Sequence, residues 1–198
     1  GKLHRRMGAA ETLTHCPTLR PEGLIAGLLY FDTRTDDARL TVSVARTAAL
    51  HGAMLANYCR LAELEPFRPG QPRTAHLVVT NPDGSTTERT VRARVVVNAA
   101  GVWSDGVNTL NEPAHHSRIR PAKGVHVVVP WEKVRSQSTL VFPMLGGLRG
   151  KGGRAFVVRW GDYCYIGTTD TPYDGDPDDV RCNRQEAELL LESLNETL

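Results

Sequence analysis

The sequence predicts a mixed α/β (α+β) fold, with part of a parallel sheet followed by a mostly antiparallel sheet with flanking helices. In residues 24–61 an apolar strand-like run, a helical pattern and a second strand-like run follow one another. The consecutive valines Val95–Val97 are typical of a strand buried on both faces of a parallel sheet. The later sequence instead alternates short strands with tight turns, as antiparallel hairpins do. Two partial domains are therefore expected in the 198 residues.

The first elements form the predicted βαβ-like unit. Residues 24–31 are a short apolar run bounded by turn-forming and polar residues, which favours a buried strand. A helix is predicted to begin near Asp36, because carboxylates are favourable at the positive end of the helix dipole. Gly52 stands where a C-terminal cap belongs, and residues 54–61 are predicted to form the next strand.

A hairpin and a buried strand follow. Residues 76–80 and 86–91 alternate apolar and polar side chains around Asp83-Gly84, a pair suited to the positive φ angles of a tight turn. Residues 94–101 are then predicted to form a strand that ends in small residues.

The second half is predicted to be mainly antiparallel and to end in a helix. Gly161-Asp162 has the form of a two-residue hairpin turn between two strands. Asn183 followed by Glu186 resembles a capping box that opens a helix over 186–194. The predicted strands are 125–129, 139–142, 155–160 and 163–168.

Composition excludes several classes of protein. A hydrophobic fraction of 40% is enough for a core, and a net charge of +2 is too small to indicate a nucleic-acid partner. The four cysteines include no C-x-x-C pair, so reduced thiols in a cytoplasmic protein are expected. The longest apolar run, 23–31, is far shorter than the about 20 residues that span a bilayer. Any membrane contact would be peripheral, on the inner face of the cell membrane.

Residues 98–105, Asn-Ala-Ala-Gly-Val-Trp-Ser-Asp, are the first candidate ligand-binding segment. Small residues after a buried strand let a ligand approach the backbone closely. Ser104 is expected to cap a short helix whose amide groups would face an anion. Taken alone, the pattern is weak evidence, because a small-residue turn after a strand is more often purely structural.

Three stretches together indicate a family. They are Val-Asn-Ala-Ala-Gly-Val-Trp at 97–103, Ile-Arg-Pro-Ala-Lys-Gly-Val-His-Val-Val-Val-Pro at 119–130, and Tyr-Ile-Gly-Thr-Thr-Asp-Thr-Pro-Tyr-Asp-Gly-Asp-Pro at 165–177. The first resembles a flavin-contacting turn of the D-amino-acid-oxidase-like superfamily. The other two resemble motifs of its FAD-dependent glycerol-3-phosphate dehydrogenase branch.

The resemblance implies a domain plan and also shows departures from it. Residues 33–110 would be a partial FAD-binding, Rossmann-like domain, and residues 1–32 and 111–198 a partial substrate-binding domain. The family's G-x-G-x-x-G turn, which seats the FAD pyrophosphate, is absent. The nearest glycine-rich stretch, 146–153, is expected to be a hairpin loop. The chain is therefore expected to be an internal fragment that needs the missing N- and C-terminal parts of the enzyme. Alone, it is expected to retain no FAD and to be inactive.

The resemblance also implies an activity in glycerol metabolism. The parent flavoprotein would oxidise sn-glycerol 3-phosphate to dihydroxyacetone phosphate by hydride transfer from C2 to FAD, and would pass the electrons to a quinone. His126 is the candidate catalytic residue, as base or substrate-orienting donor. The substrate-binding candidates are Lys123, Thr169 and Asp170. The cofactor-binding candidates are Arg60, Leu61, Ala100, Gly101 and Trp103.

Several alternatives stay open at this point. A histidine on a strand is often structural, and Lys123 also fits a surface lysine at a strand start. A related FAD oxidase of amino or hydroxy acids would share the Ala-Gly turn. A non-catalytic module that binds RNA is a third possibility, although Arg89, Arg92 and Arg94 have no aromatic residue nearby.

No metal site is expected. His115 and His116 are adjacent, so their side chains cannot easily share one metal without other ligands. The acidic loop 174–179 lacks the glycine and glutamate spacing of a calcium loop.

Overall fold

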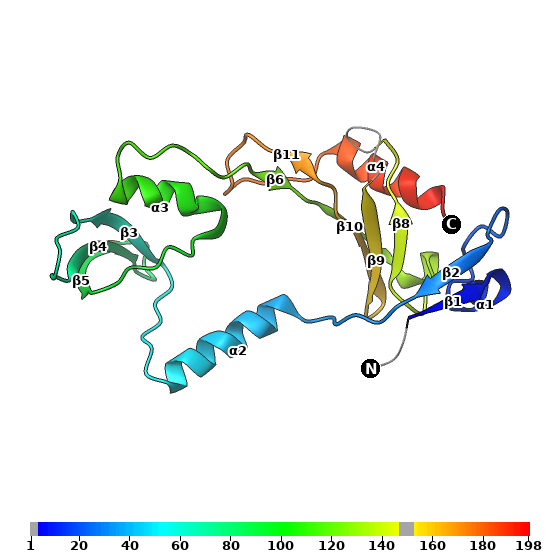
Figure 1. The fold of residues 1–198 in the computed structure, drawn as a ribbon, viewed down its shortest axis with the longest axis horizontal. Helices are drawn as coiled ribbons and strands as arrows, with labels where there is room; N and C mark the ends of the chain where they lie inside the picture. Colours follow the sequence, from blue (N-terminus) through cyan, green and yellow to red (C-terminus); the bar gives the residue numbers. More distant parts are fainter. Residues whose placement is uncertain (1–3, 147–152) are drawn as a thin grey trace. The chain divides into compact units, whose positions relative to one another are not determined.

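The computed structural model describes residues 4–146 and 153–198, and the chain divides into two units. The first comprises Gly1–Asp32 with Arg120–Leu198, and the second Thr33–Ile119. Both units combine helices with antiparallel strands (Figure 1), which confirms the mixed α/β class with mostly antiparallel sheets.

The first unit is built on a four-stranded antiparallel sheet in the order β7-β10-β9-β8. The helix α4 (Arg184–Asn195) packs against one face of this sheet (Figure 1), and side chains of both form the core. The fully buried core side chains include Phe142, Val157, Cys164, Ile166 and Leu190. The strands, β7 (His126–Pro130), β8 (Leu140–Pro143), β9 (Arg154–Trp160) and β10 (Tyr163–Gly167), confirm the four predicted for this region.

The predicted capping box is also confirmed. The side chain of Asn183 accepts a hydrogen bond from the Glu186 amide at 2.9 Å, and the Glu186 carboxylate accepts one from the Asn183 amide at 3.0 Å. These bonds satisfy amide groups that the first turn of a helix leaves without partners.

Two smaller sheets complete the first unit. In one, β1 (Arg5–Gly8) pairs antiparallel with β2 (Ala26–Leu29), and α1 (Ala9–His15) connects to β1. In the other, β6 (Ala122–Lys123) pairs antiparallel with β11 (Thr171–Pro172). This second sheet joins the segment before His126 to the loop that follows β10.

The second unit contains a three-stranded antiparallel sheet in the order β3-β4-β5, and α3 packs against β3. The hairpin around Asp83-Gly84 is confirmed as β4 with β5. The helix α2 is confirmed, with the Asp36 side chain accepting from the Arg39 amide at its start. No helix in the described part of the chain is both long and apolar enough to cross a membrane. The elements are α2 (Asp37–Leu50), β3 (Cys59–Leu64), β4 (Arg73–Thr80), β5 (Thr86–Ala93) and α3 (Ser104–Asn111).

The predicted βαβ-like unit is wrong. The strands on either side of α2 belong to different sheets, and β2 pairs with β1 whereas β3 pairs with β4, both antiparallel. The strand predicted over 54–61 begins only at Cys59, after Tyr58, whose φ of 52° is left-handed rather than extended.

The predicted buried strand over 94–101 is also wrong for the described residues. Val95 and Val97 are 76% and 81% exposed, and no described strand pairs with this segment. A strand needs hydrogen bonds from a neighbouring backbone, and valine-rich composition cannot replace them. The glycine-rich stretch 146–153 lies largely outside the described residues.

Candidate functional site

His126 is the first residue of β7, an edge strand of the four-stranded sheet, and its side chain is exposed. It stands opposite Gly167 of β10. Its ring lies edge-on to the ring of Tyr165, with ring centroids 5.4 Å apart and an interplanar angle of 86°. His126, the catalytic candidate, therefore lies at the edge of the sheet beside the ring of Tyr165.

The surface around His126 is the sheet face that α4 does not cover. Side chains alternate along each strand, so His126 and Val128 face the opposite side from the core residues Cys164 and Ile166. The exposed side chains on this open face are mainly apolar: Val128, Phe156, Trp160 and Tyr163. A titratable ring thus lies at the edge of an aromatic and apolar surface.

Lys123 is held in a buried ion pair. Its ammonium lies 2.9 Å from the Glu186 carboxylate, and the two side chains are only 9% and 7% exposed. The ammonium also donates to the Arg181 carbonyl oxygen at 3.0 Å and lies 5.6 Å from the ring centre of Tyr173. The alternative of a surface lysine is therefore wrong.

The ion pair also affects Glu186. Burial raises the pKa of this carboxyl, but the Asn183 amide, the Lys123 ammonium and the Thr171 side chain together outweigh burial, so its pKa is lowered overall. Glu186 thus has two structural tasks, because one carboxylate oxygen accepts from both the start of α4 and Lys123.

Thr169 contacts the backbone of the segment between Lys123 and His126. Its buried hydroxyl accepts from the Val125 amide at 3.1 Å and donates to the Lys123 carbonyl oxygen at 3.5 Å. Asp170 follows directly and is exposed. The structure therefore bonds Thr169 to the backbone of residues 123 and 125, directly before His126, whereas the Lys123 ammonium is directed to Glu186 and the Arg181 carbonyl oxygen.

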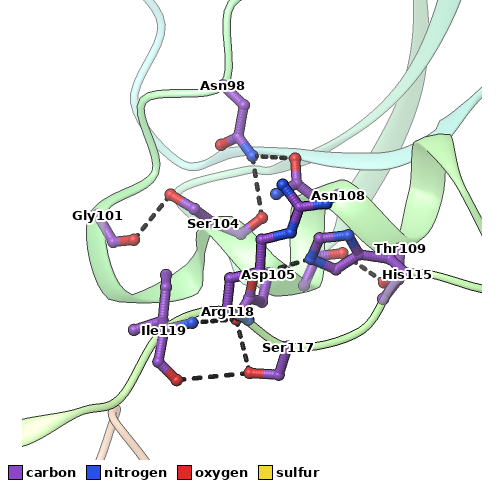
Figure 2. A network of polar contacts seen from close by, with 11 residues as sticks. Asn98, Gly101, Ser104, Asp105, Asn108, Thr109, His115, Ser117, Arg118 and Ile119 are labelled. Atoms are coloured by element: carbon purple, nitrogen blue, oxygen red, sulfur yellow. Dashed lines mark hydrogen bonds and ion pairs between the residues drawn. The ribbon is translucent and has the colours of Figure 1, made fainter.

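The small-residue turn in the second unit is braced by Asn98, as Figure 2 shows. The Asn98 amide group donates to the Ser104 carbonyl oxygen and to the Asn108 side chain, both at 2.9 Å, and its oxygen accepts from the Ala100 amide at 3.2 Å. Gly101 has a φ of 57°, the left-handed region that favours glycine. Ser104 does not cap the helix as predicted; it is the first residue of α3, and its hydroxyl donates to the Gly101 carbonyl oxygen at 2.7 Å.

The residues predicted to bind the cofactor lie in two parts of the second unit, the turn before α3 and the strand β3. The backbone at Gly101 is open, because a Cβ placed there would meet no atom within 4 Å, and Trp103 is half exposed. An open backbone of small residues lets a ligand come close to the main chain. Arg60 and Leu61 belong to β3, against which α3 packs.

Asp105 lies next to the small-residue turn and forms a polar network that the sequence did not predict. Its carboxylate accepts four hydrogen bonds from the segment after α3 (Figure 2), and these bonds hold that segment against the start of the helix. They come from the His115 ring at 2.9 Å, the Ser117 hydroxyl at 2.7 Å, and the amides of Arg118 and Ile119 at 2.9 Å each. They join residues 115–119 to α3 within the unit Thr33–Ile119.

These contacts determine the charge state of Asp105. The His115 ring, followed by the Ile119 amide and the Ser117 hydroxyl, holds the pKa of this carboxyl well below its usual range. The ring nitrogen of His115 is thus engaged by a carboxylate, and no described group of three or more His, Cys, Asp or Glu side chains is arranged to hold a metal ion. No periodic pattern links Asp105 to residues 115–119, so local sequence reasoning could not find this network.

We expect Asp105→Asn to lower the melting temperature at neutral pH. A carboxyl with a depressed folded-state pKa contributes stability above the ordinary aspartate pKa of about 4, and loses it as the pH falls through the folded value. The difference between wild type and variant should therefore be present at neutral pH and narrow below about pH 4. Thermal denaturation across this range measures it, with the exposed Asp174→Asn as control. An equal difference at every pH would contradict the assignment.

Known proteins resemble this chain along its whole length. Residues 1–198 match the model of the DAO family, described as FAD dependent oxidoreductase. A glycerol-3-phosphate dehydrogenase of Mycobacterium leprae is 35% identical over 194 residues, which are 98% of this chain and 32% of that protein. An alpha-glycerophosphate oxidase of Streptococcus pneumoniae is 34% identical over 93% of this chain and 30% of its own length. The chain thus spans about a third of these curated relatives.

Solved structures agree with these relatives. A glycerol-3-phosphate dehydrogenase from Bacillus halodurans, solved in complex with FAD, superposes with a TM-score of 0.82 at 30% identity, over 97% of this chain and 37% of that one. A glycine oxidase from Geobacillus kaustophilus superposes with a TM-score of 0.57 at 19% identity, over 100% of this chain and 47% of that one. The latter likeness concerns the fold alone.

Proposed function

The chain belongs to the family of FAD dependent oxidoreductases, and from this premise we propose that it is part of an enzyme that oxidises sn-glycerol 3-phosphate to dihydroxyacetone phosphate. The names of its relatives and the FAD complex of one solved neighbour support this activity. The observation on which the proposal mainly rests is the placement of His126, an exposed imidazole at the edge of an open, apolar sheet face.

In this proposal His126 acts at the C2 hydroxyl of the substrate. An imidazole changes its protonation near neutral pH, so it can accept the hydroxyl proton or orient the hydroxyl as a hydrogen-bond partner. FAD, when bound, supplies the acceptor for the hydride that leaves C2. The apolar side chains next to His126 would exclude water from the reacting atoms. Lys123, Thr169 and Asp170 complete the proposed substrate side.

The second unit supplies the proposed cofactor side. The exposed backbone at Ala100 and Gly101, with Trp103 beside it, would approach the flavin, and Arg60 and Leu61 would contact another part of FAD. Thr33–Ile119 would then be the FAD side and the other unit the substrate side. Because no G-x-G-x-x-G turn occurs in these 198 residues, we expect the chain alone to retain no FAD and to be inactive.

We further propose a quinone as electron acceptor and a cytoplasmic protein that contacts the inner face of the cell membrane only peripherally. The pneumococcal relative is named an oxidase, so dioxygen is the competing acceptor. Reoxidation of the reduced flavoprotein by a soluble quinone and by dioxygen, measured side by side, separates the two.

Anaerobic reduction of the flavin in the full-length protein that contains this chain tests the proposed substrate. Glycerol 3-phosphate is expected to bleach the flavin absorbance, whereas glycine, D-alanine and lactate at the same concentration are expected to leave it unchanged. Bleaching by an amino acid or by lactate alone would instead support the related oxidase of amino or hydroxy acids.

A further inference from the structure

The cross-strand neighbour of His126 is a glycine that leaves no room for a side chain. Gly167 pairs directly with His126 between β10 and β7. A Cβ placed on Gly167 would lie 2.7 Å from His126 Cδ2 and 2.7 Å from the Val125 carbonyl oxygen. Ordinary contacts of a Cβ are 3.4–4 Å. The imidazole and the Val125 carbonyl oxygen therefore together occupy the space that the Cβ of any other residue at position 167 would fill.

Tyr165 bounds the same ring from another direction. It lies two residues before Gly167 on β10, so its side chain projects to the face on which His126 lies. Its ring meets the imidazole edge to face at 5.4 Å, an arrangement that aromatic pairs favour. The His126 ring thus lies in the space that Gly167 leaves free and contacts the ring of Tyr165.

We propose that Gly167 and Tyr165 are positioning residues that set the orientation of the His126 ring for the reaction. This inference rests on the proposed role of His126 and extends it to two residues that would not touch the substrate. Catalytic groups work only within narrow limits of distance and angle, and a displacement of about 1 Å can cost about 100-fold in rate. A ring on an exposed edge strand needs such support, because solvent supplies none.

Gly167→Ala and Tyr165→Leu test the proposal in the full-length flavoprotein. Gly167→Ala is expected to slow flavin reduction by glycerol 3-phosphate by about 100-fold, with FAD content retained. Tyr165→Leu is expected to slow it less, and Tyr165→Phe, which keeps the ring, is expected to restore the wild-type rate. Gly106→Ala is the matched control, because a Cβ at Gly106 would meet no atom within 4 Å.

A double-mutant cycle with His126→Gln distinguishes positioning from general damage. If the two residues act through His126, Gly167→Ala and Tyr165→Leu should add no further loss in the His126→Gln background. Full additivity would overturn the inference, as would a wild-type rate in both variants. If the clash with the Val125 backbone prevents Gly167→Ala from folding, the two Tyr165 variants decide alone. If His126→Gln itself leaves the rate unchanged, the proposed role of His126 fails, and the inference fails with it.

Discussion

His126→Gln is expected to slow substrate-dependent flavin reduction by about 10²–10⁴-fold, the range that general acid–base catalysis contributes. Glutamine keeps a polar group of similar reach but cannot accept or release a proton near neutral pH. FAD content should not change, because His126 lies in the first unit and the proposed cofactor contacts lie in the second. The loss should therefore appear in the rate of reduction at saturating substrate, and only slightly in substrate affinity.

Stopped-flow absorbance under anaerobic conditions measures this rate. His76→Gln is the matched control, because His76 is also a partly exposed histidine on a strand, and it lies outside the proposed substrate side. Unchanged kinetics in His126→Gln would remove this residue from catalysis. A large loss in both histidine variants would indicate general damage and not chemistry.

Lys123→Met is expected to lower the free energy of unfolding by about 3–5 kcal/mol, as is typical when one partner of a buried ion pair is removed. The reason is that the Glu186 carboxylate stays buried and charged without its partner. Glu186 remains 7% exposed next to an apolar side chain, with the Asn183 amide and the Thr171 side chain left to stabilise its carboxylate. The segment that leads to His126 would also lose its side-chain bond to the Arg181 carbonyl oxygen.

Denaturant unfolding of three variants separates two effects on stability: the loss of the Lys123–Glu186 ion pair, and the cost of a buried Glu186 carboxylate without its partner. Lys123→Met/Glu186→Gln should be more stable than Lys123→Met, since glutamine removes the charge and its oxygen can still accept from the Asn183 amide. Lys133→Met, at an exposed lysine, should change stability by no more than about 0.5 kcal/mol. A Lys123→Met variant as stable as this control would contradict the buried pair.

The pH dependence of this effect follows from the lowered pKa of Glu186. A depressed carboxyl pKa contributes stability above the unfolded-state value, about 4.3 for glutamate, and loses it as the pH falls through the folded value. In Lys123→Met the buried carboxyl is instead costly when ionised and is relieved by protonation. The gap in stability between wild type and variant should therefore narrow on acidification.

Local patterns predicted the local structure well. Asp83-Gly84 and Gly161-Asp162 specified their hairpins because the turn geometry depends on the residues at the turn itself. Asn183 and Glu186 specified the start of α4 for the same reason, since a capping box spans four residues. In each case the interacting groups are close in sequence.

Interactions between distant residues were not predictable in this way. Val95–Val97 have the composition of a buried strand, but only a pairing partner elsewhere can make them one. The direction of β2 and β3 depends likewise on β1 and β4.

The candidate site shows the same division. His126, Thr169 and Gly101 were found through family motifs that are contiguous in sequence. The ion pair of Lys123 with Glu186 and the bonds of Asp105 to residues 115–119 join separate segments, so only the structure shows them.

The rate of flavin reduction by glycerol 3-phosphate deuterated at C2 tests the central claim most directly. If hydride leaves C2 beside His126, the deuterated substrate should reduce the flavin several-fold more slowly than the unlabelled one, and deuterium at C1 should have almost no effect. Equal rates for the C2-labelled and unlabelled substrates, with a slower rate for the C1-labelled one, would contradict the account, as would a flavin that glycerol 3-phosphate does not reduce.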